Sequence, residues 1–155
     1  MAMLRATLND ALKTAMKAKD QRATSTVRLI LAALKDRDIA ARGAASCDPI
    51  ADEAILEMLQ KMVKQRHESI EMYRKGARED LVRQEQEEIA IIERFLPKQM
   101  DEAEMAEAVD AAIRAVGATG IKDMGKTIAT LKKDHAGRMD FAKASGVVKR
   151  RLGAA

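Results

Sequence analysis

Apolar residues recur every three or four positions along most of the chain, which is the spacing of an α-helix that buries one face. Four helices are predicted before residue 97, over about residues 3–18, 20–39, 50–75 and 78–96. Asp20 is expected to begin the second helix. Asp48-Pro49 is expected to begin the third, since a capping carboxylate precedes a proline whose backbone suits a first turn. Gly76 is expected to end it, and the short connection to the next helix predicts antiparallel packing.

Pro97 interrupts this pattern, because proline disfavours a helical conformation for the residue before it. Asp101 and Glu104 then have the spacing of a capping box, which predicts another helix start. Three helices are predicted after the proline, over about residues 101–116, 122–133 and 140–152. No segment alternates apolar and polar residues as a strand would. The expected fold is all-α, with a four-helix bundle over residues 1–97 and a three-helix domain over residues 98–155.

The composition agrees with helices and narrows the chemistry. Ten methionines, no tryptophan and only two prolines favour a few long helices over strands. The single cysteine excludes a disulfide framework and a cysteine-rich zinc site, and it fits a reducing compartment. No run of apolar residues is long enough to span a membrane, and the first residues lack the apolar segment of a secretory signal. We therefore expect a cytoplasmic protein with no membrane partner.

The net charge of +4 is spread unevenly along the chain. Residues 1–42 carry +5, residues 43–116 carry −7, and residues 117–155 carry +6, from nine basic and three acidic side chains. A basic end of this kind indicates a polyanionic partner. The RNA-binding candidates are Lys122, Lys126, Lys132, Lys133, Arg138, Lys143, Lys149, Arg150 and Arg151. Because few aromatic residues are available to stack unpaired bases, contacts to the phosphates and shape of folded RNA are expected. A solubilising surface is the alternative.

The segment from Gly120 to Thr127 matches the phosphate-binding pattern G-x-x-x-x-G-K-[ST] at every fixed position. That motif works only where a strand leads into the loop, so that backbone N–H groups converge on a phosphate. Here an alanine-rich helix is predicted before the loop. We therefore interpret the segment as a turn that enters a helix, and no nucleotide cofactor is predicted.

Other candidates for catalysis or metal binding lack partners in the sequence. His67 and Glu71 lie one helical turn apart, but two ligands on one helix are too few for a metal site. Cys47 lies in a loop of small residues with no histidine nearby in the sequence. Three serines also lack a recognisable activating partner: Ser25, Ser69 and Ser145. We predict no catalytic residue and no metal site.

Three glutamates stand close together in the fourth predicted helix. Glu87 and Glu88 are interpreted as part of a solvated face. Glu85 is the exception, because it falls on the apolar stripe of that helix. We expect Glu85 to pair with Arg66 or Arg74 from the antiparallel third helix, chiefly as a structural ion pair.

A family resemblance is carried by three runs of sequence, namely KMVKQRHESIEMYRKGAREDL at residues 61–81, ERFLPKQM at 93–100 and KDMGK at 122–126. With them the chain resembles GatB/YqeY-domain proteins of the YqeY type over nearly its whole length. The resemblance implies a four-helix bundle joined to a three-helix one. It also implies kinship with the tail of the B subunit of glutamine-dependent tRNA amidotransferase, which is associated with tRNA recognition. The family is further associated with carbon–nitrogen ligase activity that uses glutamine as amido-N-donor.

Three hypotheses follow for function. The first is an accessory module that binds tRNA or another structured RNA and is not catalytic by itself, with the run from Lys149 to Arg151 as its strongest candidate contact. The second is an interaction adaptor whose acidic middle docks on a protein partner in tRNA aminoacylation or amidation. The third, a glutamine-dependent amide transferase, ranks last, because the residues supply no arrangement of nucleophile, base and oxyanion donors.

Overall fold

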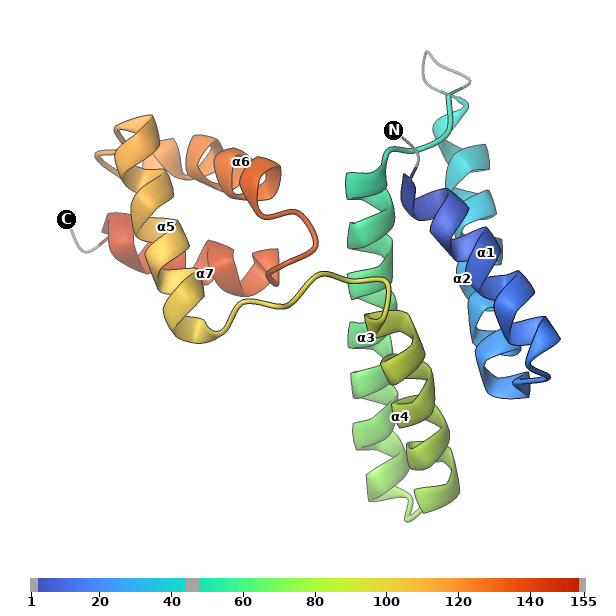
Figure 1. Ribbon diagram of the computed structural model, residues 1–155. Coiled ribbons are helices and arrows are strands. Elements are labelled where there is room, and N and C mark those ends of the chain that lie inside the picture. Colours follow the sequence, from blue (N-terminus) through green and yellow to red (C-terminus); the bar gives the residue numbers. More distant parts are fainter. Residues whose placement is uncertain (1–2, 44–47, 154–155) are drawn as a thin grey trace. The chain divides into compact units, whose positions relative to one another are not determined.

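The computed structural model describes residues 3–43 and 48–153. Most of these residues lie in seven α-helices and none lies in a strand, so the predicted all-α class is confirmed. The chain divides into two compact units, Met1–Leu96 and Pro97–Ala155 (Figure 1).

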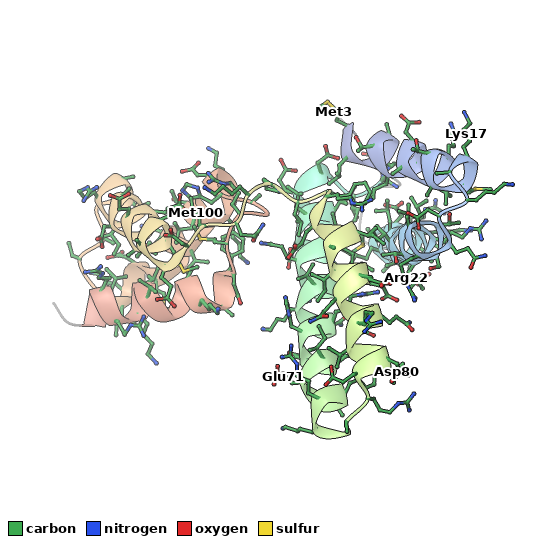
Figure 2. All side chains as sticks on the ribbon, turned by 60° about the horizontal axis from the view of Figure 1, so that its bottom comes forward. Met3, Lys17, Arg22, Glu71, Asp80 and Met100 are labelled. Carbon is green, nitrogen blue, oxygen red and sulfur yellow. The ribbon has the colours of Figure 1, made fainter. Side chains whose placement is uncertain are left out.

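The first unit contains four helices: α1 (Met3–Lys17), α2 (Gln21–Ala41), α3 (Asp52–Lys75) and α4 (Glu79–Glu93). Helix α1 packs against α2 and α3 packs against α4, so each pair forms a hairpin, and α2 also packs on α4. Glu71 and Asp80 lie near the turn that closes the second hairpin (Figure 2). The core takes fully buried apolar side chains from all four helices: Leu8, Ile30, Ile55, Leu59 and Ile92. Burying each such side chain contributes about 1.5–3 kcal/mol.

The helix boundary at Asp20 is confirmed. Its carboxylate accepts a hydrogen bond from the backbone N–H of Ala23 at 3.0 Å, which caps α2. Lys19 before it has a φ of 56°, and this left-handed residue reverses the chain between α1 and α2. Ala77 has a φ of 55° and reverses the chain in the same way after Gly76, the C-terminal cap of α3.

The predicted helix start at Asp48-Pro49 is wrong, since α3 begins only at Asp52. The carboxylate of Asp38 accepts a hydrogen bond from the backbone N–H of Ile50 at 3.0 Å. A guanidinium N–H of Arg5 donates to the Ile50 carbonyl at 3.4 Å. These two side chains take the backbone groups that Ile50 would use within a helix, and so they override the local proline signal.

Thr26 on α2 is a polar residue enclosed in the first unit. It is fully buried, and its hydroxyl has no hydrogen-bond partner among the described residues. A buried hydroxyl without a partner costs about 1–3 kcal/mol.

We expect Thr26→Val to raise the free energy of unfolding by about 1 kcal/mol in urea denaturation, because valine keeps the branched shape and removes the unpaired hydroxyl. Thr14→Val is the control, since Thr14 is exposed on α1 and its hydroxyl donates to the Asp10 carbonyl at 3.0 Å. A Thr26→Val chain no more stable than the parent would contradict this account.

The second unit contains α5 (Glu102–Val116), a short 3-10 helix η1 (Ile121–Asp123), α6 (Met124–Asp134) and α7 (Phe141–Gly153). Each of the three α-helices packs against the other two. Their shared core is small and includes Met105, Val109, Leu131, Met139 and Val148. The second unit is therefore small, and the charged side chains on the outer faces of its three helices share a small surface.

The capping box predicted for α5 is confirmed. The carboxylate of Asp101 accepts from the backbone N–H of Glu104 at 2.8 Å, and the carboxylate of Glu104 accepts from the backbone N–H of Asp101 at 2.9 Å. Gly117, with a φ of 62°, ends the helix in the left-handed conformation that glycine adopts without strain. The start of α5, which lies beside the candidate site described below, is thus fixed by its own sequence.

Candidate nucleic-acid interface

Three lysines lie along η1 and α6, and we call them the α6 stripe: Lys122 in η1, and Lys126 and Lys133 on one side of α6. All three are exposed. Lys126 and Lys133 are seven residues apart, just under two turns, so they share a side of the helix about 10 Å apart along its axis. None of the three forms an ion pair within the described ranges. The stripe is therefore a row of positive charge without direct ion pairs in that part of the chain.

Asp123 fixes the turn that leads into the α6 stripe. The backbone N–H of Thr119 donates to its carboxylate at 2.9 Å, and this bond does most to hold the pKa of Asp123 below its ordinary value. The nearby charges of Lys122 and Lys126 act in the same direction. The carboxylate thus stays ionised and orders the loop without forming an ion pair with either lysine.

Two other predicted candidates are engaged within the unit. Arg138 donates a hydrogen bond from Nε to the Lys98 carbonyl at 3.3 Å, and its own carbonyl accepts from the backbone N–H of Met100 at 2.7 Å. Arg138 therefore fastens the segment that precedes α5. Lys132 lies outside the stripe, with its Nζ 5.9 Å from the centre of the Phe141 ring, a cation–π distance.

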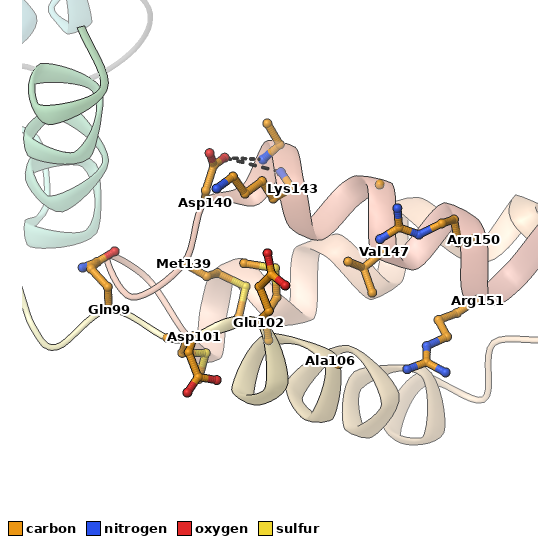
Figure 3. Close-up of a pocket in the computed structure, with 14 residues that line it drawn as sticks. Gln99, Asp101, Glu102, Ala106, Met139, Asp140, Lys143, Val147, Arg150 and Arg151 are labelled. Carbon is orange, nitrogen blue, oxygen red and sulfur yellow. Dashed lines mark hydrogen bonds between the residues drawn. The ribbon is translucent and has the colours of Figure 1, made fainter. Parts of the chain in front are cut away.

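The remaining candidates are on α7. Lys143, Arg150 and Arg151 line a groove between α5 and α7, with a volume of about 1440 Å³ (Figure 3). Arg151 forms an ion pair with Asp110 of α5, at 3.3 Å from Nε to Oδ1. Lys149 is exposed but does not line the groove.

The basic run from Lys149 to Arg151 is thus divided between two sides of α7, because consecutive helical residues point about 100° apart. The structure brings Arg150 together with Lys143, seven residues earlier, rather than with its neighbour Lys149. The three residues are consecutive in the sequence, but in the helix Lys149 points to a different side of α7 from Arg150.

The segment that matches the phosphate-binding pattern forms η1 and the first turn of α6. It follows α5, and the described residues contain no strand that could lead into it. The hydroxyl of Thr127 is fully buried and donates to the Asp123 carbonyl at 3.0 Å. This side chain is therefore engaged inside its own helix, where it cannot reach a phosphate or its metal ion.

The other chemical candidates can be placed only in part. Within residues 3–43 and 48–153, no group of three or more His, Cys, Asp or Glu side chains could hold a metal ion. His67 is exposed on α3. Cys47 lies outside the described residues. None of the described helices has the length and apolarity needed to cross a membrane.

Comparison with known proteins agrees with the helical architecture and the sequence motifs. The profile of the YqeY-like protein family matches residues 5–152. The chain belongs to this family. The resemblance seen in the sequence is thereby confirmed over nearly the whole YqeY-like chain, although family membership assigns no role to any of its basic residues.

Relatives of this YqeY-like chain include three fungal proteins, each called "Altered inheritance of mitochondria protein 41, mitochondrial". The protein from Eremothecium gossypii is 37% identical over 89 residues, which cover 57% of this chain and 46% of the relative. The protein from Lachancea thermotolerans is 37% identical over 91 residues, with coverages of 59% and 46%. A Saccharomyces cerevisiae protein is 37% identical over 90 residues, with coverages of 57% and 46%. The match thus spans about half the length of each relative.

The first unit of the YqeY-like chain contains a buried ion pair that sequence analysis missed. Glu88, interpreted as solvated, is only 7% exposed, and Arg66 Nε donates to its Oε2 at 2.9 Å. Glu85 lies 4.0 Å from Arg66 Nε, so its expected pairing with Arg66 is confirmed, although at a longer distance. Arg74 instead pairs with Glu71 at 3.1 Å.

The burial of Glu88 leaves a signal in the sequence. Glu88 is four residues before the buried Ile92, so it lies on the same side of α4 as that core residue. Its second carboxylate oxygen accepts from Gln84 at 3.3 Å and lies 3.9 Å from Arg22 on α2. The pair therefore links three helices, and its position indicates a role in stability.

Proposed function

We propose that this YqeY-like chain is an RNA-binding accessory module that contacts tRNA or another structured RNA through the α6 stripe. One observation carries the proposal: three exposed lysines lie along η1 and α6, two of them on one side of α6, and have no ion-pair partner among the described residues. Lysines arranged in this way neutralise successive phosphates and release condensed counterions. Lys149, exposed on α7 outside the groove, is the candidate to extend this contact.

The charge on the neighbouring helix supports an approach from the α6 side. Helix α5 carries four acidic residues and a single basic one. These carboxylates repel phosphates, so the unit presents opposite charge on different helices. We therefore expect an RNA bound at the α6 stripe not to extend over the carboxylates of α5.

The aromatic content favours folded RNA over unpaired strands. The chain has two phenylalanines, one tyrosine and no tryptophan. In the second unit the only aromatic ring is that of Phe141, which is half-buried and packs against the core. Without a row of exposed rings to stack on bases, binding rests on phosphate and shape contacts, the mode used for double-stranded RNA.

A salt series with the full chain and a labelled tRNA transcript tests this proposal. We expect a gel shift at 50 mM salt and a log–log plot of affinity against salt with a slope of about −3, since three lysines neutralise about three phosphates. The same transcript digested with ribonuclease is the control and should give no shift. Intact tRNA that stays unshifted at low salt would overturn the proposal.

For the cellular compartment we propose the cytoplasm, because a single cysteine fits a reducing environment. The names of the fungal relatives describe mitochondrial proteins, which makes the mitochondrion the competing location. Fractionation of the source cells with antibodies against this chain distinguishes the two. Recovery in an organelle fraction alone would contradict the cytoplasmic proposal.

A further inference from the structure

The groove between α5 and α7 is lined partly by apolar side chains, whereas the α6 stripe consists of lysines. We call it the α5–α7 groove. Its accessible apolar lining is provided by Met100, Ala106, Ala142 and Val147, together with the almost fully buried core residues Met105 and Met139. Met100 is half-buried, and a methionine side chain is flexible and polarisable, so it can adapt to apolar partners of varied shape. The volume of about 1440 Å³ exceeds the roughly 300–1,000 Å³ of a typical small-molecule site.

Three of the six charged side chains that line the α5–α7 groove already have partners within the chain. Asp101 caps α5 through the backbone N–H of Glu104. Asp140 accepts from the backbone N–H groups of Ala142 at 2.9 Å and Lys143 at 3.4 Å, as Figure 3 shows. Arg151 is paired with Asp110 of α5. These charges serve the fold of the unit itself.

Two basic side chains on the α7 wall remain without such a partner in the described part of the chain, namely Lys143 and Arg150. They are seven residues apart on one side of α7, about 10 Å along the axis. Val147 lies between them (Figure 3). Along two turns of α7, the side facing the groove therefore carries a positive residue, an apolar residue and a second positive residue. Glu102 faces the groove from α5 and likewise has no ion-pair partner there.

We propose that the α5–α7 groove binds an acidic amphipathic helix of a partner protein. Two carboxylates seven residues apart on that helix pair with Lys143 and Arg150, and its apolar side lies against Met100, Ala106 and Val147. Helix-in-groove recognition uses anchors at this spacing. A nucleic-acid backbone is charged along its whole length and would also lie against Asp101, Glu102 and Asp140, whereas an amphipathic helix can place its carboxylates opposite Lys143 and Arg150 alone. The surface is separate from the α6 stripe, so the proposal goes beyond RNA binding and does not depend on it.

A synthetic helical peptide of about 18 residues, long enough for five turns, is the probe. It carries leucines on one side and two glutamates seven residues apart beside them. The control peptide has the same composition, with both glutamates moved to the opposite side. Fluorescence anisotropy with the full chain should give a Kd of about 10–100 μM for the probe and at least about tenfold weaker binding for the control.

Neighbouring residues of α7 provide matched variants. Arg150→Glu should weaken probe binding by about tenfold or more, because it places a carboxylate opposite a carboxylate. Lys149→Glu makes the same charge change one residue away, outside the groove, and should change binding less than about twofold. A second probe has lysines in place of its two glutamates. It should bind the double variant Lys143→Glu/Arg150→Glu more tightly than it binds the parent chain. Circular dichroism checks that each variant keeps its helices.

Four results would overturn the proposal. The first is no binding of the probe at about 1 mM, beyond the weakest affinity expected of a specific site. The second is equal binding of probe and control, or equal losses for Arg150→Glu and Lys149→Glu. The third is a tRNA affinity that falls more with Arg150→Glu than with Lys149→Glu, which would make the groove a phosphate surface. The fourth is a dimer in sedimentation that Arg150→Glu dissociates, which would make a second copy the occupant.

Discussion

Replacing Glu88 by glutamine should lower the free energy of unfolding of the full chain by about 2–3 kcal/mol, as measured by urea denaturation. The substitution keeps the size of the side chain but removes the negative charge 2.9 Å from Arg66 Nε. The side chain of Arg66 is only 13% exposed, so water cannot replace the lost carboxylate. Among the described residues, Arg66 then keeps only the carboxylate of Glu85, 4.0 Å from its Nε, and a buried charge that loses its main partner is among the most destabilising of single changes.

Glu85→Gln is the matched control, because it makes the same chemical change one turn away on α4 and should have the opposite sign. Burial, and then the negative charge of Glu88, raises the pKa of Glu85 above its ordinary value, although Arg66 opposes this. The folded chain therefore holds the Glu85 proton more tightly than the unfolded chain does. Stability from this group is present below the ordinary pKa of a glutamate and is lost as the pH rises through the raised pKa.

At neutral pH we expect Glu85→Gln to raise the midpoint of thermal unfolding by about 1–3 °C. The advantage of this variant should shrink as the pH falls towards the ordinary pKa of glutamate, where the parent side chain becomes protonated. Thermal melts of both variants from about pH 4, near the ordinary pKa of a glutamate, to about pH 7 give the comparison. Equal destabilisation by Glu85→Gln and Glu88→Gln at neutral pH would show that the two glutamates act alike, against this account.

Removing the α6 stripe should weaken tRNA binding by roughly 10- to 100-fold at low salt. The variant is Lys122→Ala/Lys126→Ala/Lys133→Ala, and all three side chains are exposed, so the fold should survive. Each lost phosphate contact reduces the magnitude of the slope of log affinity against log salt by about 1. The variant should therefore bind with almost no dependence on salt.

The control for this variant removes three exposed lysines from α3: Lys61, Lys64 and Lys75. Both triple variants lower the net charge by the same amount. If tRNA binding came from overall charge alone, the two would lose equal affinity. An unchanged salt slope after removal of the α6 stripe would contradict the proposed contact.

Helix boundaries set by neighbouring residues could be predicted from the sequence. The capping box of Asp101 and Glu104 involves residues three positions apart, so the sequence contains all of its parts. The start of α3 could not be predicted in this way. It depends on Arg5 and Asp38, which lie 45 and 12 residues from Ile50 along the chain and bind its backbone. Only the packing of α1 and α2 brings them there.

The sequence predicts that the C-terminal segment is basic. It does not predict that the basic residues divide between the α6 stripe and the α5–α7 groove. Helical spacing alone places Lys126 and Lys133 on one side of α6, and Lys143 and Arg150 on one side of α7. Which of these sides meets α5 depends on how the three helices pack. The same limit applies in part to Glu88: its spacing from Ile92 places it on the core side of α4, but that α2 and α3 cover the side chain follows only from the packing.

The hairpins of the first unit have a consequence for folding during synthesis. Consecutive helices pack against each other there, and the chain entropy needed to close such short connections is small. Helical proteins with mostly local contacts fold in microseconds to milliseconds. A ribosome adds about 5–20 residues per second, so residues 97–155 take about 3–12 s to follow. The Arg66–Glu88 pair can therefore form while the basic unit is still being made, before any RNA can bind to it.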